Sequence, residues 1–466
     1  MFYNITWKEG GMMYDTIRLI SEYIKDREYS KIRTLLSDVE AYDLAVILEG
    51  LTPEALVVVF RLLPKELAAE AFAEMDTESR ITLIDSFSDS ELRYVIEELY
   101  YDDAVDMIEE MPANVVKRIL SNATVETRNS INALLRYSSD SAGGVMTTEY
   151  VRFNENITVA EAIRQIREVG IDKETIYNCY VTKKDRTLVG VVSAKDLLLS
   201  SPDVIIGDIM MTSVISAKTS DDKGSVARAM QNYDFIAMPI VDNESRLVGI
   251  VTYDDAMDVI TEESDEDIQI MAAITPTETS YLDQSIFSIW KARFPWLLIL
   301  MISATFTSII ISSFEKKLSA LVILTAYIPM LMGTGGNCGS QASVTIIRGL
   351  SLGDIHFIDV FRVMWKEFRV SLMCAITLSV VNFIKLYLFD ILIIKTPGLT
   401  VTVAAVICLT LAVVVICAKF IGCSLPILAK RIGLDPAVTA SPFITTCIDA
   451  VALLVYFGFA TWMLNI

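Results

Sequence analysis

The chain has 466 residues, with 59 Asp and Glu against 39 Lys and Arg, and its formal net charge is −20. From Gln284 onward there are 13 basic and seven acidic residues, so an acidic part of net charge −26 precedes an apolar part of net charge +6. The acidic part repels nucleic acid and anionic lipid, and it suits cations. Because His356 is the only histidine, His-based metal sites and His catalysis are nearly excluded.

Cysteine usage and the N-terminus indicate the compartment. Six of the seven cysteines lie in apolar or membrane-adjacent sequence, only Cys179 lies in the acidic part, and no CxxC pair appears. This usage fits a reducing compartment. Residues 1–13 lack the charged-then-apolar pattern of a signal peptide, so we expect the acidic part to remain in the cytoplasm.

Residues 1–137 carry a repeat of about twelve residues. Units such as Leu51 to Glu54 and Leu63 to Glu66 combine an N-cap residue or an early proline with an acidic first turn, and apolar residues follow at helical spacing. Each unit predicts one short helix. The stretch is therefore expected to form an acidic, all-helical, solenoid-like N domain.

Three aspartates of this domain form a candidate cation site. Asp102 and Asp106 are four residues apart, so they share one helix face, and Asp103 lies beside them. Like charges at this spacing repel each other unless a cation or a partner intervenes. A solvated acidic face explains the same three residues at least as well.

Residues 138–271 contain an internal repeat, with a first copy over 138–201 and a second over 202–271. In each copy, apolar strands of four to six residues alternate with helices, which predicts two small α/β modules. The copies carry the segments LVGVVS and LVGIVT, each followed by an Asp. The pair resembles tandem CBS domains.

In CBS pairs that bind nucleotides, the Ser or Thr that ends this strand and the Asp three residues later hold ribose and phosphate. Ser193 with Asp196, and Thr252 with Asp255, have this spacing. A hydroxyl and a carboxylate at a helix N-terminus can hydrogen-bond ribose hydroxyls while backbone N–H groups meet phosphate. These residues are candidates for binding ATP. A purely structural helix N-cap is the alternative, because many CBS pairs bind nothing.

The segment from Asp254 to Asp267 holds eight carboxylates and no basic residue. Mg²⁺ binds proteins through one or two carboxylates and keeps several waters, so this run is a candidate low-affinity sensor surface. Asp222 and Asp234 of the second repeat could join the same surface. An acidic helix that simply faces water is the alternative.

A connecting helix is expected over residues 272–291, and a transmembrane domain with five helices over 292–466. The apolar runs at roughly 294–314, 318–332 with a continuation, 370–389, 401–425 and 440–464 are each long enough for a bilayer core of about 30 Å. Basic residues gather in the loops of one side. Positive-inside bias therefore places the acidic part in the cytoplasm and the C-terminus outside.

Asp449 is the central candidate, because a carboxylate in a membrane-length segment usually faces a polar path rather than lipid. A second polar feature is the stretch from Gly333 to Gln341, where we expect the second span to break, although close helix packing also explains such glycines. Lys385 and Lys419 lie in other apolar runs, and either one could neutralise Asp449 as a buried ion pair.

The order of helical domain, CBS pair, connecting helix and five spans resembles the MgtE family of magnesium channels along essentially the whole chain. Three motifs carry the resemblance. They are the segment from Asp140 to Val151, the glycines and amides around Gly335-Gly336-Asn337, and the run from Leu434 to Asp449 with its Ser-Pro and Thr-Thr pairs.

The resemblance implies a homodimer with the ion path on the two-fold axis. It implies Asp449 as the main pore residue, with Asn337, Ser441 and Thr445 as pore-lining candidates. It also implies ATP at the CBS pair near Asp196 and Phe235. The acidic residues that it assigns to a cytosolic Mg²⁺ sensor are Asp102, Asp106, Asp222, Asp234, Asp255, Asp258, Glu263, Glu266 and Asp267.

Three positions depart from the family pattern. Ser340 stands where the family often has Asn, Gly224 where an acidic sensor residue is expected, and Ser441 where an Asn can line the pore. These departures leave the assignment of Asp449 intact. They bear on sensor affinity and on fine ion selectivity.

The resulting hypothesis is a Mg²⁺ channel or transporter for magnesium uptake in the plasma membrane, gated by cytosolic Mg²⁺ and modulated by ATP. A CBS-regulated transporter of another divalent cation, Mn²⁺ or Co²⁺, is the alternative. A membrane-anchored receptor without transport needs no intramembrane acid, which counts against it. An enzyme is not expected, because the sequence offers no phosphate loop, no nucleophile with its triad partners and no histidine base.

Overall fold

The computed structural model describes residues 11–277, 281, 284–314, 321–439 and 441–464. The chain divides into two compact units, Met1–Ile260 and Thr261–Ile466. The first unit, the soluble unit, holds the helical N domain and the CBS pair. The second, the membrane unit, holds the long apolar helices.

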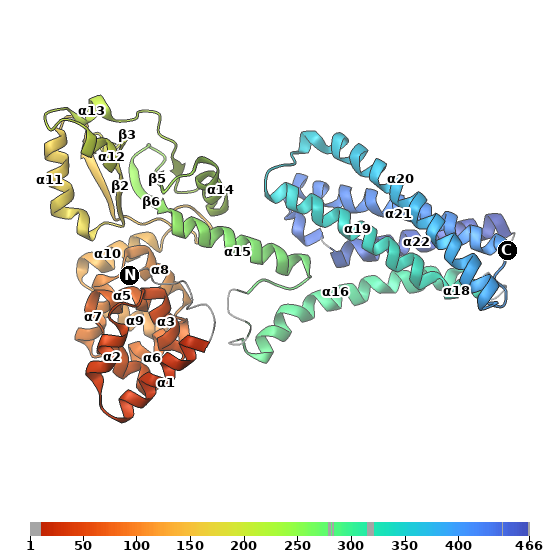
Figure 1. The fold of residues 1–466 in the computed structure, drawn as a ribbon. Coiled ribbons are helices and arrows are strands. Elements are labelled where there is room, and N and C mark those ends of the chain that lie inside the picture. Colours follow the sequence, from red (N-terminus) through yellow and green to blue (C-terminus); the bar gives the residue numbers. More distant parts are fainter. Residues whose placement is uncertain (1–10, 278–280, 282–283, 315–320, 440, 465–466) are drawn as a thin grey trace. The chain divides into compact units, whose positions relative to one another are not determined.

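The N domain consists of short helices connected by tight turns (Figure 1). Capping residues explain their starts: the Asp76 carboxylate accepts from the Ser79 N–H, and Ser88 and Glu91 form a capping box. The twelve-residue repeat thus correctly predicts one helix per unit. The helices are α1 Gly11–Lys25, α2 Tyr29–Leu36, α3 Ala41–Glu49, α4 Pro53–Phe60, α5 Lys65–Ala73, α6 Thr77–Ser86, α7 Asp89–Glu98, α8 Tyr101–Glu110, α9 Ala113–Asn122 and α10 Val125–Leu134.

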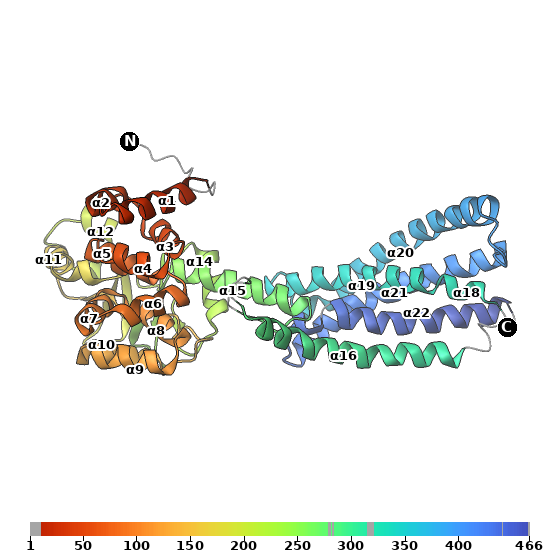
Figure 2. The same ribbon diagram turned by 90° about the horizontal axis from the view of Figure 1, so that it is seen from below.

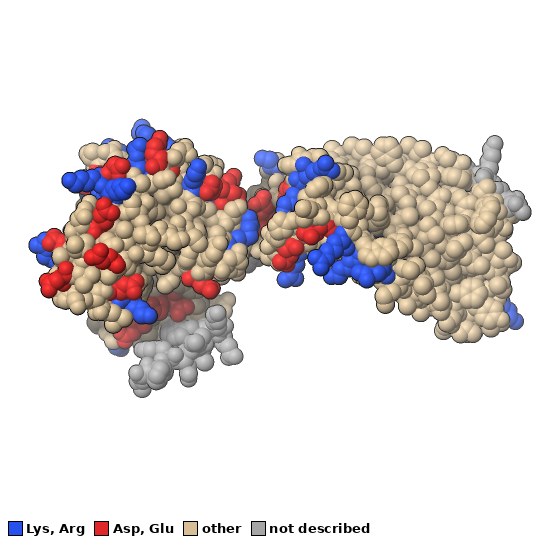
Figure 3. Space-filling view, turned by 90° about the horizontal axis from the view of Figure 1, so that it is seen from above, with Lys and Arg blue, Asp and Glu red and all other residues tan. Residues whose placement is uncertain are grey.

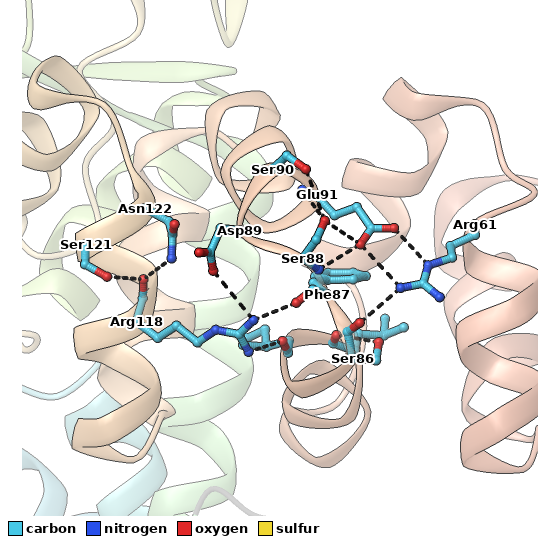
Figure 4. A network of polar contacts seen from close by, with 12 residues as sticks. Arg61, Ser86, Phe87, Ser88, Asp89, Ser90, Glu91, Arg118, Ser121 and Asn122 are labelled. Atoms are coloured by element: carbon cyan, nitrogen blue, oxygen red, sulfur yellow. Dashed lines mark hydrogen bonds and ion pairs between the residues drawn. The ribbon is translucent and has the colours of Figure 1, made fainter.

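Arginines connect helices of this stack that are three apart in the chain, α4 with α7 and α6 with α9 (Figure 4). Arg61 binds Glu91 with Nε to Oε1 at 2.8 Å, and Arg118 donates to the carbonyl oxygens of Ile84 and Phe87, each at 2.6 Å. The two carbonyl groups that Arg118 binds lie at the C-terminal end of α6. The last carbonyl groups of a helix lack the usual partners within the helix, so Arg118 stabilises this end. Hydrogen bonds from Ser88 and from Arg61 lower the pKa of Glu91 to about 2.

The CBS pair contains two three-stranded sheets of identical topology. In each sheet the first strand pairs with the second in parallel, and the second pairs with the third antiparallel. The strands are β1 Tyr150–Asn154, β2 Thr175–Thr182, β3 Leu188–Ser193, β4 Ala217–Lys218, β5 Ala237–Val241 and β6 Leu247–Thr252; the helices are α11 Val159–Val169, η1 Gly170–Asp172, α12 Ala194–Leu199, α13 Ile206–Ile209 and α14 Lys223–Tyr233. The predicted pair of α/β modules is confirmed.

The connecting helix exists but lies earlier than predicted. Helix α15 spans Tyr253–Met271, whereas residues 272–277 are not helical, and α16 starts only at Ile286. Ala273 takes a left-handed conformation with φ 55°, and the Ile274 N–H returns to the Gln269 carbonyl at 3.0 Å, which ends α15. The expected helix over 272–291 is therefore wrong in its bounds. Its last residues belong to α16, which Ser285 caps.

The membrane unit consists of α16 Ile286–Ser313, α18 Ile323–Ala326, α19 Ile328–Ser351, η2 Phe357–Asp359, α20 Val360–Lys385, the π-helix η3 Leu386–Ile393, α21 Val401–Arg431, η4 Pro436–Thr439 and α22 Ser441–Leu464. Figures 1 and 2 both show α19, α21 and α22 side by side. On the face in Figure 3, most charged side chains of this unit gather at one end, one basic side chain lies at the other end, and the long middle is uncharged.

Four helical segments of the described chain are long and apolar enough to cross a membrane: Ile286–Ser313, Phe357–Ile393, Val401–Arg431 and Pro442–Leu464. Helix α19 has 24 residues and a length of about 36 Å, which suffices for a span, but its glycines and amides make it less apolar. The beginning of the predicted second span, at residues 318–320, lies outside the described residues. A fifth span at α19 remains a prediction.

The expected break at Gly333 to Gln341 is wrong, because α19 is one continuous helix from Ile328 to Ser351. Its glycines allow close packing instead. A Cβ on Gly335 would lie 2.7 Å from Val414 Cγ1 of α21, and one on Gly339 would lie 2.0 Å from Ile448 Cδ1 of α22. The glycine-rich sequence therefore marks helix contacts and leaves the helical backbone intact.

Candidate functional site

Asp449 lies in the third turn of α22, half-buried in the core of the membrane unit. Its Oδ1 is buried and has no hydrogen-bond partner among the residues that the structure describes. The preceding residue, Ile448, packs on Gly335 and Gly339 of α19. The α22 turn that carries Asp449 is thus fixed against the glycine-rich face of α19.

Neither intramembrane lysine neutralises Asp449. Lys385 Nζ lies 2.6 Å from Asp390 Oδ2. Lys419 Nζ lies 3.5 Å from Glu367 Oε2. The alternative of a buried ion pair with Asp449 is therefore wrong, because each lysine has its own acid on α20 or its π-helical extension.

The three predicted pore-lining residues differ in their surroundings. Asn337 is exposed on α19. Thr445 lies one turn before Asp449 on α22. Its methyl group packs closely on Gly336 of α19, because a Cβ added to Gly336 would lie 2.8 Å from Thr445 Cγ2. Ser441 begins α22, and its side chain lies outside the described residues. Thr445 and Asp449 therefore share one helix face.

An acidic cluster lies within the soluble unit, where α8 meets the start of β2 and of α15. It consists of Asp102, Asp103, Glu149, Glu174 and Asp255. Glu149 orders it, because its carboxylate accepts from the Tyr101 N–H at 2.9 Å and its carbonyl accepts from the Glu174 N–H at 2.9 Å. Asp102 Oδ1 and Glu174 Oε2 are buried and have no hydrogen-bond partner in the described chain.

Burial and mutual repulsion raise the pKa values of these acids. Burial, followed by the charges of Asp255 and Asp103, raises the pKa of Asp102 well above its usual range. Burial and neighbouring carboxylates raise the pKa of Glu174 to about 8, and burial is also the main cause that raises the pKa values of Asp103 and Asp255 to about 6. The cluster therefore holds protons more strongly than isolated carboxyl groups do.

The cluster is not a finished set of direct metal ligands. Among the described residues, no group of three or more His, Cys, Asp or Glu is close enough to hold a metal ion. Mg²⁺ needs only one or two carboxylates and keeps several waters. The orphaned oxygens of Asp102 and Glu174 fit that kind of hydrated cation.

The remaining predicted sensor residues are spread over other elements. Asp222 caps α14, accepts from the Ser225 N–H at 2.8 Å and lies 3.6 Å from Arg228, so its carboxylate has a structural role. Asp234 ends α14 in a left-handed conformation with φ 55°. Of the others, Asp106, Asp258 and Glu266 are exposed, Glu263 and Asp267 are half-buried, and Asp267 accepts from Ser351 Oγ at 3.1 Å.

The predicted nucleotide residues bind each other. Ser193 Oγ donates to Asp196 Oδ2 at 2.7 Å and accepts from the Asp196 N–H, and Thr252 Oγ1 donates to the Asp255 carboxylate in the same way. Both pairs thus act as helix caps, the structural role given above as the alternative. Phe235 stacks on Tyr233 with ring centroids 5.5 Å apart.

Sequence reasoning placed Asp103 beside Asp102 in a candidate cation site, but it did not assign Glu149 and Glu174 to any site. Glu149 lies in the motif from Asp140 to Val151, which offered a signal. Glu174 directly precedes β2 and lies far from the other acids in sequence, so only the fold brings it beside Asp255.

Comparison with known proteins agrees with this architecture. Residues 328–459 match the family model "Divalent cation transporter" (MgtE), residues 39–140 the MgtE intracellular N domain, and residues 142–203 and 206–262 the CBS domain.

The magnesium transporter MgtE of Thermus thermophilus is 36% identical to this chain over 450 residues, which are 96% of this chain and 98% of the relative. The magnesium transporter MgtE of Bacillus subtilis is 31% identical over 456 residues, which are 97% of this chain and 98% of the relative. A solved cytosolic domain of the Mg²⁺ channel MgtE in complex with ATP is 37% identical, covers 52% of this chain and 98% of its own, and has a TM-score of 0.49.

The soluble regulatory domains and the apolar helices together define a membrane transporter with an intracellular N domain, and not an enzyme. The two relatives span nearly the full length of the chain at more than 30% identity. The chain belongs to the MgtE family of divalent cation transporters.

Proposed function

We propose that this chain carries Mg²⁺ across the plasma membrane through a path in which Asp449 is the main ion-binding residue. The observation that supports this function is the Asp449 Oδ1 atom, which is buried without a partner among the described residues, while Lys385 and Lys419 pair with other acids. An unpaired carboxylate between apolar helices is costly. A cation that passes Asp449 supplies the positive charge that compensates its carboxylate.

The path is proposed to lie on the two-fold axis of a homodimer, where two copies of Asp449 face each other. A pair of carboxylates can hold a hydrated dication that one carboxylate holds weakly. Thr445 lies on the same face one turn earlier, which supports its place along the path. Asn337 and Ser441 are proposed as further lining residues.

The ion is proposed to be Mg²⁺, because carboxylate, hydroxyl and amide oxygens suit hard cations. Mn²⁺ and Co²⁺ are the alternative substrates. Cys447, two residues before Asp449, is the one softer ligand nearby on α22. Competition by Mn²⁺ and Co²⁺ in a Mg²⁺ flux assay separates the two substrate classes.

The acidic cluster is proposed as the cytosolic Mg²⁺ sensor. Asp102, Glu174 and Asp255 come from three elements, so a cation between them favours the compact arrangement of the N domain on the CBS pair. When Mg²⁺ falls, repulsion between the carboxylates loosens that arrangement and the path opens. The exposed acids Asp106, Asp258 and Glu266, with Glu263 and Asp267, are proposed to add to this sensor surface.

ATP is proposed as a regulatory ligand at Ser193, Asp196, Phe235 and Thr252. The support is that the two hydroxyl and carboxylate pairs stand at helix N-termini. The acidic half is proposed to face the cytoplasm and the C-terminus to lie outside. The basic residues in the first part of α20 and in the last turn of α21 agree with this orientation.

The test of the transport function is Mg²⁺ flux into proteoliposomes. Asp449→Asn should lower the flux at least tenfold, because it removes the charge and keeps the size. Asp354→Asn, which removes an exposed carboxylate of the same unit, is the matched control and should keep the wild-type flux. Elution volume on a sizing column checks folding. A folded Asp449→Asn protein with unchanged flux would move the path to the surroundings of Asn337.

A further inference from the structure

A groove of about 910 Å³ lies between the first turns of α20 and the last turns of α21. Its lining residues are Phe357, Ile358, Val360 and Phe361 on one side and Ser424, Ile427, Leu428 and Arg431 on the other. Ile358 is 90% exposed and Phe361 86% exposed. The groove is therefore an open apolar surface with one fixed charge.

The lengths of the two helices indicate that the groove lies at the level of lipid headgroups. The segment Phe357–Ile393 has 37 residues and is about 55 Å long, and α21 has 31 residues and is about 46 Å long, whereas a hydrocarbon core is about 30 Å thick. Both helices thus extend beyond the core. Trp365 lies two turns into α20, with Arg369 5.9 Å above its ring, and this pairing is typical of the membrane interface.

Arg431 is a cation held at the rim of the groove. Its guanidinium lies 4.6 Å from the centroid of the Phe357 ring, and no carboxylate within the described ranges forms an ion pair with it. The neighbouring Lys430 does not point its charge into the groove in the same way, because the Lys430 Nζ donates to the Leu350 carbonyl at 2.8 Å. The nearby Asp359 carboxylate accepts from the His356 N–H at 3.2 Å. Arg431 therefore keeps its N–H donors for an external acceptor.

We propose that this groove binds one anionic phospholipid, with its phosphate on Arg431 and an acyl chain along Phe361 and Leu428. A guanidinium fork matches phosphate oxygens in geometry and charge. The basic residues Arg362 and Lys366 on the exposed part of α20 add to the positive charge. Pairing this groove with the same groove of a second copy would bring like charges together, whereas a phosphate group complements them, so charge complementarity favours lipid.

Native mass spectrometry of the full-length protein tests the proposal. The protein is titrated in neutral detergent with dioleoyl phosphatidylglycerol or dioleoyl phosphatidylcholine, and the affinity for the first bound lipid is measured. The wild type should prefer phosphatidylglycerol about fivefold, the factor that one basic residue near anionic headgroups contributes. Arg431→Gln should abolish the preference. Leu428→Trp should fill the groove and weaken both lipids.

Lys395→Gln is the matched control, because it removes an exposed basic residue from the opposite end of the membrane unit and should keep the preference. Equal binding of both lipids to the wild type, or a full preference in Arg431→Gln, would overturn the proposal. Displacement of lipid by glycerol 3-phosphate alone would show a phosphate site without a lipid. If Arg431→Gln became monomeric but kept the preference for phosphatidylglycerol, the groove would be an interface between two copies of the chain and the lipid proposal would be wrong.

Discussion

The ammonium group of Lys419 on α21 lies 3.5 Å from the carboxylate of Glu367 on α20, and the two side chains are only 9% and 17% exposed. The pair connects two helices that run in opposite directions through the apolar part of the molecule. It also removes Lys419 as a counter-charge for Asp449. Asp449 on α22 therefore has no lysine partner because Lys419 on α21 already binds Glu367 on α20.

Glu367→Gln should destabilise the protein by about 3–5 kcal/mol, because it leaves the buried charge of Lys419 without compensation. The double variant Glu367→Gln with Lys419→Met should recover most of this loss. Unfolding equilibria in mixed micelles measure both. Lys395→Met, at an exposed lysine, serves as the control. A double variant as unstable as Glu367→Gln would show that the charges do not interact.

Gly422→Ala should disrupt the contact between α19 and α21, because its Cβ would lie 2.2 Å from the Gly339 carbonyl oxygen. We expect a lower melting temperature and a loss of Mg²⁺ flux. Gly333→Ala is the matched control in α19, where a Cβ meets no atom within 4 Å. It should be neutral or stabilise the helix by up to about 1 kcal/mol. Equal effects of both substitutions would contradict the packing role.

The acidic cluster predicts a pH dependence of stability in the absence of Mg²⁺. The carboxyl groups of Asp103, Asp255 and Glu174 have raised pKa values in the folded protein, so the fold binds their protons more tightly than the unfolded chain does. Their stabilising effect is complete below the unfolded pKa values near 4 and is lost as pH rises to about 8. The melting temperature in EDTA should therefore fall between pH 5 and pH 8.

Mg²⁺ should reduce this fall, because a bound cation replaces the protons. Glu174→Gln should flatten the profile between pH 6 and pH 8, and Glu168→Gln, at an exposed acid of α11, should leave it unchanged. Thermal melts of the full chain in detergent with and without Mg²⁺ measure the effect. An identical profile in Glu174→Gln would exclude Glu174 as the group that titrates.

Asp196→Ala should weaken ATP binding at least tenfold, since ribose loses a carboxylate partner that Ser193 holds in place. Isothermal titration of the full chain with ATP measures the affinity. Asp203→Asn, at an exposed acid after α12, is the control and should bind ATP like the wild type. Unchanged ATP affinity in Asp196→Ala would show that Ser193 and Asp196 only cap helix α12 and do not bind ATP.

Local patterns predicted much of this architecture. The twelve-residue repeat and its capping residues set the helices of the N domain, and the two strand segments set the CBS sheets, because caps and strand periods act over a few residues. What was missed depends on distant partners. The continuity of α19 depends on Val414 and Ile448, and the partner of Lys419 lies 52 residues earlier in the chain.

The end of the connecting helix was also missed, since it depends on a single residue in a left-handed conformation. Ala273 is not a residue type that signals such a turn, and Gly or Asn would have. The acidic cluster shows a similar limit. The spacing of Asp102 and Asp106 suggested a shared face, yet the fold buries Asp102 beside Glu174 and leaves Asp106 exposed.

The backbone approach at Gly339 and Gly422 also limits how an ion path can open. Helices α19 and α21 meet there without intervening side chains, so sliding one past the other would bring backbone atoms into collision, and the Ile448 side chain of α22 packs against Gly339 as well. We therefore expect α19 and α21 to move together. A gate that required α19 to slide along α21 would have to break this backbone contact, so neither of these two helices alone can serve as its moving part.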